Sequence, residues 1–228
     1  MSYSELLSQV PLFSSLGSDD LERLSASLQL RRCNRGEIIF HQGDVGTDLY
    51  IISKGEVTIR LSSPDGREVS LALLVRGAAF GELALLDEAP RSTDAVAREE
   101  TALLSLSRRD FQKFLEERPQ VIPALLAELS RLVRRVTQAV HDANFLDARA
   151  RLARVLLDLA QAQGKPSTGG EAVAITSRLT QTELANLAGL TRESTNRWLR
   201  FYAREGLLSY EEGRITLLEP DNLRLNLE

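Results

Sequence analysis

Polar and charged side chains that could read nucleic-acid bases gather around position 195 of this 228-residue chain. Arg192 and Glu193 are followed by Asn196 and Arg197. Arginine can donate two parallel hydrogen bonds to O6 and N7 of guanine, and glutamate can accept one from N4 of cytosine. The group therefore predicts contacts with DNA bases. The alternative is a solvated helix with ordinary surface charges.

A second group suited to binding a ligand lies in the segment 80–93 (FGELALLDEAPRST). Gly81 allows the backbone to approach a ligand closely. Glu82 can accept a hydrogen bond from a ribose 2′-hydroxyl, and Arg91 can contact a phosphate through two charge-assisted hydrogen bonds. Ser92 adds a hydroxyl and a backbone N–H. These residues match what the phosphate and sugar of a cyclic nucleotide require.

The same segment predicts a short helix over 83–86, whose N-terminus would favour a phosphate. The alternative is a surface loop in which Arg91 pairs with Asp87 or Glu88.

Two helices must position the base-reading residues. Thr180 and Glu183 have the spacing of a capping box, which predicts a helix start. Gly189 supplies the positive φ that a tight reversal needs, and Thr191 is the next N-cap. A hairpin is then predicted over 207–218. The order helix, turn, helix and hairpin is typical of a winged helix-turn-helix.

Strand signals dominate from about residue 30 to residue 106. Alternation of apolar and polar residues over 57–62 predicts a half-buried strand, and the turn 64–66 follows it. Further strands are expected over 69–74 and 102–106. Short strands at this spacing predict a barrel or jelly roll.

A long helix is expected over about 120–144, followed by a hinge at Phe145-Leu146 and a new helix capped by Asp147. Its apolar residues step alternately by four and three, which predicts a parallel coiled-coil dimer, although the stripe could instead pack on its own domain. The predicted seam comprises Leu125, Leu129, Leu132, Val136, Ala139 and Ala143. The segment 163–170 is expected to form a surface loop by its composition.

Composition excludes several classes of protein. No run of about eighteen apolar residues exists to cross a membrane, and residues 1–10 do not have the pattern of a signal peptide. The single cysteine, Cys33, cannot form an internal disulfide or supply a cysteine cluster for a metal. We therefore expect a cytoplasmic protein of two domains without a metal site, and the net charge of −4 does not favour general coating of nucleic acid.

The residues of both groups resemble those of a known family. The order Gly-Glu-Leu-Ala, then Pro-Arg-Ser, is similar to the phosphate-binding cassette of cyclic-nucleotide-binding domains. With the long helix and the second helix of the turn, almost the whole chain resembles the bacterial CRP/FNR family of transcription regulators. The resemblance implies an α+β fold with a β jelly-roll sensor domain over 1–118, a dimerisation helix and hinge over 119–146, and a winged helix-turn-helix over 147–228.

The resemblance also implies a role for each ligand residue. Glu82 would hold the ribose hydroxyl, and Arg91 and Ser92 would hold the cyclic phosphate. Val136 and Thr137 occupy the positions that face adenine in members responsive to cyclic AMP, but valine cannot make the polar contact. This departure leaves three alternatives: weaker cyclic AMP binding, another purine ligand, or a binding cassette kept for its shape alone. The implied ligand-binding set is Gly81, Glu82, Leu83, Ala84, Arg91, Ser92, Val136 and Thr137.

On the DNA side, Arg192, Glu193 and Arg197 match the base-reading residues of the cyclic-AMP-receptor branch. This match implies that a homodimer reads a TGTGA-like inverted repeat in double-stranded DNA, with RNA polymerase as a further partner. Arg200 is expected to contact phosphate, and Trp198 is expected in the core. The implied DNA-binding set is Thr180, Arg192, Glu193, Asn196, Arg197 and Arg200.

Other branches and classes are disfavoured. Oxygen-sensing members hold an iron–sulfur cluster with several cysteines, whereas this chain has only Cys33. Haem sensing would depend on His41 and His141, the two histidines, and we expect neither to bind a metal. No catalytic set is recognisable, so we do not expect an enzyme. Two alternatives stay open: a ligand-independent regulator with a vestigial pocket, and a cyclic-nucleotide-binding regulatory subunit that does not bind DNA.

Overall fold

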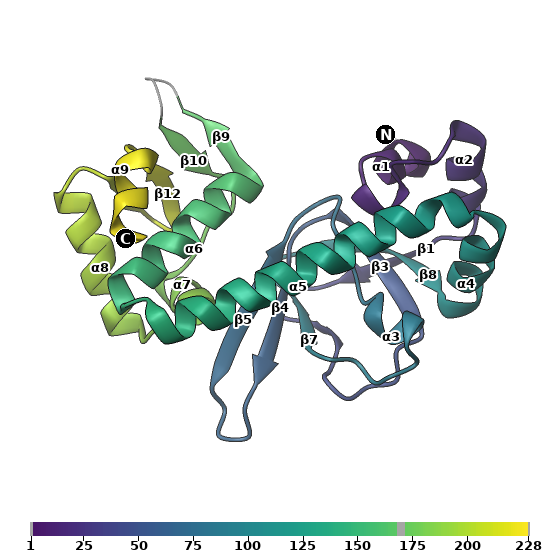
Figure 1. The fold of residues 1–228 in the computed structure, drawn as a ribbon, viewed down its shortest axis with the longest axis horizontal. Helices are drawn as coiled ribbons and strands as arrows, with labels where there is room; N and C mark the ends of the chain where they lie inside the picture. Colours follow the sequence, from purple (N-terminus) through teal and green to yellow (C-terminus); the bar gives the residue numbers. More distant parts are fainter. Residues whose placement is uncertain (1, 168–171, 228) are drawn as a thin grey trace. The chain divides into compact units, whose positions relative to one another are not determined.

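The computed structural model describes residues 2–167 and 172–227 (Figure 1). The chain divides into two compact units, Met1–Arg67 with Leu71–Arg135 and Glu68–Ser70 with Val136–Glu228. Helix α5 (Ile122–Phe145) is continuous across residues of both units, which confirms the predicted long helix. None of the helices in the described ranges is long and apolar enough to cross a membrane.

Eight strands of the N-terminal part form two four-stranded sheets, in the orders β1-β8-β3-β6 and β2-β7-β4-β5. This pair of sheets confirms the predicted jelly roll, and strands β4, β5 and β8 confirm the expected strands. The bounds are β1 (Gln29–Cys33), β2 (Ile38–Phe40), β3 (Asp48–Lys54), β4 (Val57–Ser62), β5 (Glu68–Leu74), β6 (Ala79–Phe80), β7 (Asp94–Ala97) and β8 (Thr101–Ser107).

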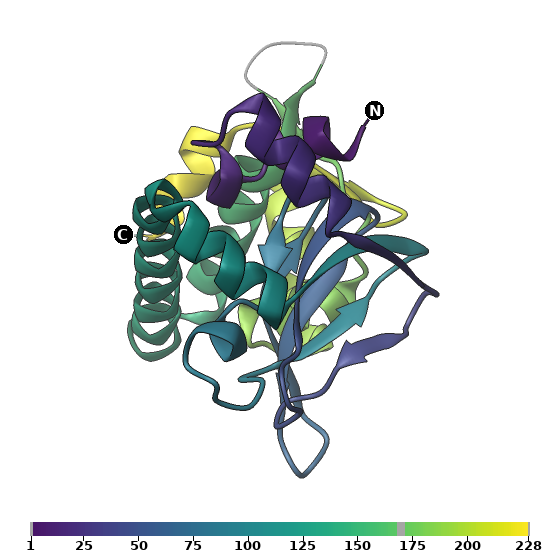
Figure 2. The same cartoon turned by 90° about the vertical axis from the view of Figure 1, so that its right-hand side faces the viewer.

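Helices cover one face of the first sheet. Ser2 caps α1 by accepting a hydrogen bond from the Glu5 N–H, and Ser107 caps α4 in the same way with Asp110. Figure 2 shows α1 and α2 lying over one end of the strands. No element was predicted for the first 28 residues. The bounds are α1 (Tyr3–Ser8), η1 (Pro11–Phe13), α2 (Ser18–Ala26), α3 (Leu83–Leu86), α4 (Arg108–Glu117) and η2 (Pro119–Val121).

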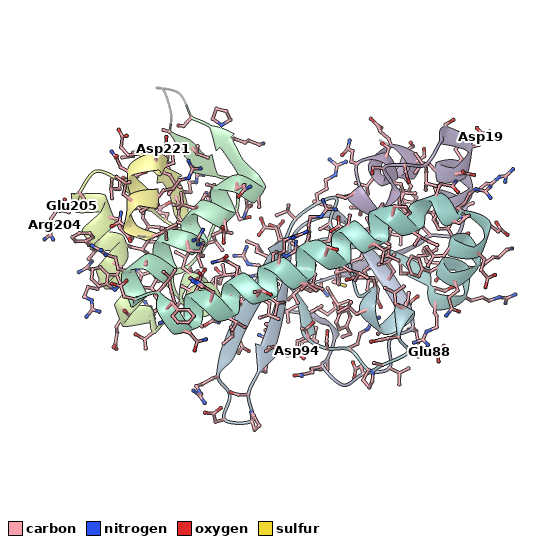
Figure 3. All side chains as sticks on the ribbon, in the orientation of Figure 1. Asp19, Glu88, Asp94, Arg204, Glu205 and Asp221 are labelled. Atoms are coloured by element: carbon pink, nitrogen blue, oxygen red, sulfur yellow. The ribbon has the colours of Figure 1, made fainter. Side chains whose placement is uncertain are left out.

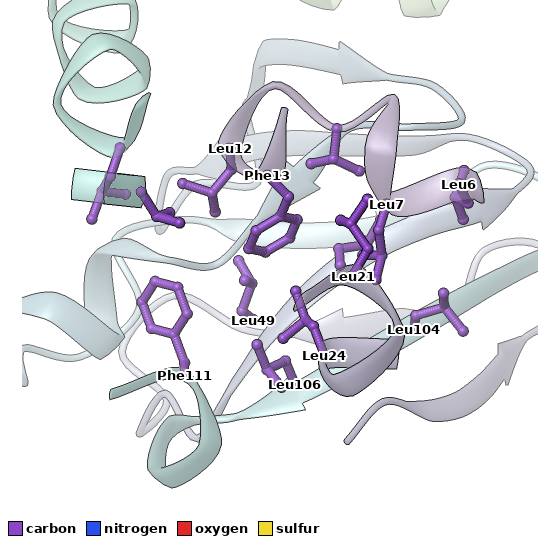
Figure 4. Close-up of a cluster of buried hydrophobic side chains, with 14 of the residues drawn as sticks. Leu6, Leu7, Leu12, Phe13, Leu21, Leu24, Leu49, Leu104, Leu106 and Phe111 are labelled. Carbon is purple, nitrogen blue, oxygen red and sulfur yellow. The ribbon is translucent and has the colours of Figure 1, made fainter. Parts of the chain in front are cut away.

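The alternation of side chains in β3 separates two hydrophobic clusters. Leu49 and Ile51 belong to the cluster under the helices, with Leu7, Phe13 and Leu106 (Figure 4). Tyr50 and Ile52 belong to a second cluster between the sheets. Because successive strand residues point to opposite faces, one strand supplies both clusters. The second cluster includes Phe40 and Tyr50, and the guanidinium of Arg91 in the ligand segment lies over their rings.

In the second unit, helix α6 packs against α7, α8 and α9. Asp147 caps α6 by accepting a hydrogen bond of 2.7 Å from the Ala150 N–H, as predicted. The strands form a sheet in the order β11-β12-β10-β9. The bounds are α6 (Ala148–Gln163), β9 (Gly164–Pro166), β10 (Val173–Ile175), α7 (Gln181–Ala188), α8 (Arg192–Arg204), β11 (Leu208–Glu211), β12 (Arg214–Leu217), α9 (Pro220–Arg224) and η3 (Leu225–Leu227).

One expectation about these elements was wrong in detail, and one alternative holds in part. The expected loop over 163–170 contains β9, which pairs antiparallel with β10, while 168–170 lie outside the described residues. At the start of the apolar stripe on α5, the alternative of packing on its own domain holds. Leu125 is buried in the cluster under the helices, whereas the neighbouring Leu126 is 57% exposed. The part of α5 that packs on its own unit uses the Leu125 side.

Candidate functional site

The segment 80–93 folds as predicted around a one-turn helix, α3. Gly81 has φ +86°, a backbone conformation that favours glycine, and a Cβ there would lie 2.7 Å from Nη1 of Arg91, which would have to shift. Ala84 is buried, Leu83 is partly buried and Ser92 is exposed. The loop therefore brings six predicted ligand residues together.

Arg91 is the centre of this group and is only 4% exposed. Its Nη1 donates to the Gly81 carbonyl at 2.5 Å, and its Nη2 donates to the Asp48 carbonyl at 2.7 Å. Its guanidinium carbon lies 4.3 Å from the centroid of the Phe40 ring. The Nε is shielded from solvent and has no hydrogen-bond partner among the described residues. Burial lowers the pKa of this guanidinium, while Tyr50 and nearby carboxylates oppose the shift.

The alternative of a surface arginine paired with an acidic residue of the same loop is wrong. Arg91 is buried, and Glu88, labelled in Figure 3, lies 3.7 Å from Arg108 instead. Arg108 also donates to the carbonyls of Gly46 and Ala84, at 2.7 and 2.8 Å. Arg108 thus fixes the loop through these contacts, whereas Arg91 is the buried arginine of the site.

Glu82 is the acidic member of the group and is partly buried. Burial raises the pKa of its carboxyl, and the negative charge of Glu128 adds to the rise. The positive charges of Arg135 and Arg91 act in the opposite direction. A donor that hydrogen-bonds to the ionised carboxylate would therefore offset a real desolvation penalty.

A turn next to the loop is tied to it through Arg91 and Asp94. The Gly43 N–H donates to the Arg91 carbonyl at 2.9 Å, and the Arg91 N–H donates to the Asp44 carbonyl at 2.8 Å. Buried Asp94 accepts from the Gln42 N–H and the Ser62 hydroxyl. Burial raises the pKa of Asp94, but these hydrogen bonds and Arg60 outweigh it, so the pKa lies below its usual value.

Sequence reasoning missed several residues of this site. Asp48 and Phe40 contact Arg91 from strands that lie more than forty positions away along the chain, since the Asp48 contact spans 43 residues. Tyr50 and Phe80 stack beside Phe40, with centroids 5.4 Å apart. The alternation of residues along a strand predicts the sheet face on which each ring lies, but it does not predict which ring or side chain packs against it. Val136 and Thr137 lie on α5 in the second unit, and both are exposed.

The second candidate site is formed by α7 and α8. Thr180 and Glu183 form the predicted capping box, Gly189 ends α7 with φ +60°, and Thr191 caps α8 by accepting from the Ser194 N–H. All the local signals for this motif are therefore confirmed. The Gln181 side chain donates to Asn196 at 3.2 Å, a link between the helices that was not predicted.

One face of α8 carries the residues expected to contact DNA. Glu193, Arg197 and Arg200 are exposed and recur at helical spacing, and Arg204 continues the row at the C-terminal end of the helix (Figure 3). The opposite face buries Thr195, Leu199 and Tyr202. An open groove of about 500 Å³ is lined by this face, namely Glu193, Asn196, Arg197, Trp198, Arg200, Phe201 and Arg204. Arg192 and Thr180 are exposed. Trp198 is partly buried, with its Nε1 shielded from solvent, so the expected core position holds only in part.

The hairpin β11–β12 confirms the predicted wing. Glu212 and Gly213 both have positive φ, as a two-residue reversal of this type requires. The Gly213 carbonyl accepts from the Leu179 N–H at 2.7 Å, and the Tyr210 hydroxyl donates to the Leu179 carbonyl at 3.2 Å. The wing is thus tied to the residue that precedes the cap of α7.

Within 2–167 and 172–227, no three histidine, cysteine or acidic side chains gather as a metal site would require. His41 lies 3.6 Å from Asp94, and His141 lies 3.2 Å from Asp142.

Comparisons with known proteins agree with this geometry. A family profile described as cyclic nucleotide-binding domain matches residues 30–118, and one described as Crp-like helix-turn-helix domain matches residues 150–225. The CRP-like cAMP-activated global transcriptional regulator of Mycobacterium tuberculosis is 33% identical over 219 residues, which cover 96% of this chain and 97% of that protein.

Two further relatives extend the comparison. The cyclic AMP receptor protein of Thermus thermophilus is 35% identical over 209 residues, which cover 92% of this chain and 93% of that protein. The structure of the c-di-GMP responsive global regulator CLP of Xanthomonas campestris matches with a TM-score of 0.74 and 26% identity, over 88% of this chain and 99% of that one. The Mycobacterium relative is named as a transcriptional regulator and not as an enzyme. The match to a Crp-like helix-turn-helix domain makes the alternative of a regulatory subunit without DNA binding wrong. The chain belongs to the CRP/FNR family of DNA-binding transcription regulators, with a cyclic nucleotide-binding domain and a Crp-like helix-turn-helix domain.

Proposed function

We propose that this regulator is controlled by a cyclic nucleotide, with cyclic AMP as the first ligand to test, and that it reads a TGTGA-like inverted repeat as a homodimer. The observation that carries the ligand proposal is the guanidinium of Arg91. It is buried against an aromatic ring. Among the described residues it donates to two backbone carbonyls and to no carboxylate, and its shielded Nε–H has no partner. A phosphate would supply both the missing acceptor and the missing charge.

The ribose is assigned to Glu82. Desolvation makes ionisation of its carboxyl unfavourable, and a sugar hydroxyl that donates to the carboxylate would recover part of that free energy. Gly81 keeps the backbone free of a side chain at this point. We assign the second phosphate contact to Ser92, and the shape of the turn to Leu83 and Ala84.

The residues expected to contact the base of the ligand are Val136 and Thr137, and they do not fix which base is bound. Val136 and Thr137 are assigned to it by resemblance, and only Thr137 can form a hydrogen bond to a purine. Two relatives at 33% and 35% identity are named for cyclic AMP, and one at 26% is named for c-di-GMP. Cyclic AMP is therefore favoured, with cyclic GMP and c-di-GMP as the ligands to compare. A ligand-independent regulator is the second candidate.

A stripe on α5 supports the dimer. Leu126, Val133, Val136 and Val140 are each at least half exposed, although all four are aliphatic. Ala143 is also exposed, whereas Leu129 is partly buried against the cluster under the N-terminal helices. The six residues recur at alternating steps of three and four, the spacing of a coiled-coil seam. A second copy of the same helix would bury them. We propose this stripe, 126/129/133/136/140/143, as the dimer seam.

The DNA-reading roles follow from the exposed face of α8. We assign base contacts to Arg192, Glu193, Asn196 and Arg197 and a phosphate contact to Arg200, while Thr180 closes the cap beside them. In a dimer that reads an inverted repeat, the two recognition helices must be about 34 Å apart. Ligand binding would favour that arrangement by a population shift.

We propose a separate task for each of the three segments of the chain. Residues 1–118 would sense the ligand, 119–146 would join the two subunits, and 147–228 would read the operator. A regulator of this kind acts in the cytoplasm, with RNA polymerase as a partner.

Calorimetric titration of the purified protein with cyclic AMP, cyclic GMP and c-di-GMP tests the ligand. We expect saturable binding of cyclic AMP, and at least a roughly thirty-fold loss in Arg91→Ala because a buried charge-assisted contact is removed. The control is Arg109→Ala, which removes an exposed arginine of α4. Thermal melts confirm that both variants fold. Binding of none of the three nucleotides, together with tight DNA binding, would establish the ligand-independent alternative.

A further inference from the structure

One aromatic residue on the DNA-reading helix has no place in the function described so far. Trp198 is the only tryptophan of the chain, and it is partly exposed on α8. The guanidinium carbon of Arg197 lies 5.1 Å from the centroid of its ring. Consecutive residues of a helix do not face one another. This contact therefore requires Arg197 to fold back across the indole.

The indole is held by a series of packed rings that begins in the core. Trp198 meets Phe201 edge to face, with centroids 5.7 Å apart and planes at 85°. Phe201 packs in turn against Tyr202 at 5.7 Å. Tyr202 is fully buried, and its hydroxyl donates to the Arg149 carbonyl at 3.0 Å. Burial raises the pKa of Tyr202 to about 12, so it stays a neutral donor. The platform under Arg197 is therefore fixed to α6.

Packing alone does not account for tryptophan at this position. The indole Nε1 is shielded from solvent and has no hydrogen-bond partner among the described residues, so the ring is held in spite of an unsatisfied donor. An aliphatic side chain would fill the space without that penalty. What an aliphatic residue lacks is an electron-rich face, and tryptophan has the strongest attraction for a cation among the aromatic side chains.

We propose that Trp198 is a positioning residue for base recognition: its ring holds the guanidinium of Arg197 over the exposed face of α8, so that the arginine meets guanine with fewer rotamers to lose. The proposal rests on the proposed base-reading role of Arg197. Among the described residues, the other contact that restricts Arg197 is one of 3.5 Å with the Ser194 hydroxyl. The effect belongs to specificity at one base pair, and Arg200, which lies three residues away on the same face, does not share it.

The test begins with an operator recovered from random duplexes by the wild-type protein, so that it does not depend on the TGTGA assignment. The base pair read by Arg197 is the one whose replacement weakens wild type but not Arg197→Ala. At that base pair we expect Trp198→Leu to reduce discrimination about two- to five-fold, equivalent to about 0.5–1 kcal/mol. Trp198→Phe should retain most of it, because the phenyl ring keeps an aromatic face.

Two controls separate positioning from a structural role. Discrimination at the base pair read by Glu193 should be unchanged in Trp198→Leu, and Trp198→Leu should have no further effect in the Arg197→Ala background. Equal losses at every base pair, or the same loss without Arg197, would overturn the proposal.

Tryptophan fluorescence provides a second test that does not depend on whether the Trp198→Leu variant folds. Since Trp198 is the single tryptophan, the tryptophan fluorescence of the protein reports the surroundings of this one indole, which include the Arg197 guanidinium. Arg197→Ala should change the emission intensity, and Arg200→Ala should not. Identical emission in wild type and Arg197→Ala would refute the contact. If wild type recovers no preferred sequence at all, the proposed function has failed, and this second test still decides the contact.

Discussion

Arg91 has hydrogen-bond partners for its terminal nitrogens but no partner for its Nε and no anion in direct contact among the described residues. Its two terminal nitrogens donate to the carbonyls of Gly81 and Asp48, and its face lies over Phe40. All three partners are neutral, whereas a buried guanidinium stays protonated and needs an anion for full compensation. The carboxylate of Glu82 acts on it electrostatically from the same loop. A phosphate ligand would complete this charge distribution.

Glu82 provides a prediction about pH. Its folded pKa is raised, so the folded protein binds this proton more tightly than the unfolded chain does. The associated stability is fully present below the unfolded pKa of about 4.3 and is lost as the pH rises through the folded pKa. Without ligand, Glu82→Gln should therefore raise the melting temperature at pH 7 and not at pH 4, by about 2–4 °C for each kcal/mol gained.

The measurement is a pair of thermal melts at the two pH values. Glu116→Gln, which alters an exposed glutamate on α4, is the matched control. A lower melting temperature for Glu82→Gln at pH 7 would contradict a desolvated carboxyl at this position. The same variant should bind the nucleotide more weakly, because a neutral amide is a poorer acceptor for the ribose hydroxyl.

At the scale of elements, α5 has two faces with different tasks. Leu125 packs with Leu49 and Phe111 in the cluster under the N-terminal helices. The proposed dimer seam begins one residue later, at Leu126. Beyond Leu132 the described side chains of α5 are exposed up to Phe145 except for Asp142, which accepts from Gln138 and lies 3.5 Å from Arg154. Because apolar residues lie on both faces, spacing alone left open whether the stripe packs on its own domain or on a second copy.

The dimer seam gives a prediction about assembly. Val133→Glu should weaken the dimer at least about a hundred-fold, because each subunit loses a buried valine worth about 1.5 kcal/mol and gains a charge in the seam. Ala127→Glu adds the same charge at an exposed position off the seam and should leave the dimer intact. Sedimentation equilibrium measures both. Unchanged assembly in Val133→Glu would rule out this face as the interface.

How far the sequence predicts each element depends on the range of its signals. The caps at Thr180, Thr191 and Asp147 act within three residues, and all three are confirmed. The register of the α5 stripe depends on the N-terminal helices, for which no element was predicted. In the site, Gly81 could be predicted from its chemistry, whereas Asp48 is brought to Arg91 only by the pairing of sheets. Such contacts need the tertiary fold.

At the scale of the whole molecule, the ligand loop and the base-reading face belong to different units, and α5 contributes residues to both. Under the proposed function, coupling between the two sites would act through a shift in the population of conformations. Such a coupling is reciprocal, since the factor by which ligand tightens DNA binding must equal the factor by which DNA tightens ligand binding. Typical couplings are about 5- to 150-fold.

The most direct test of the account is to measure both affinities of the wild-type protein in one buffer. The dissociation constant of cyclic AMP is determined with and without a saturating operator duplex, and that of the operator with and without saturating cyclic AMP. We predict that each ligand tightens the other at least about five-fold and by the same factor. Cyclic AMP that binds with the same affinity in the presence and absence of the operator would contradict control by the nucleotide.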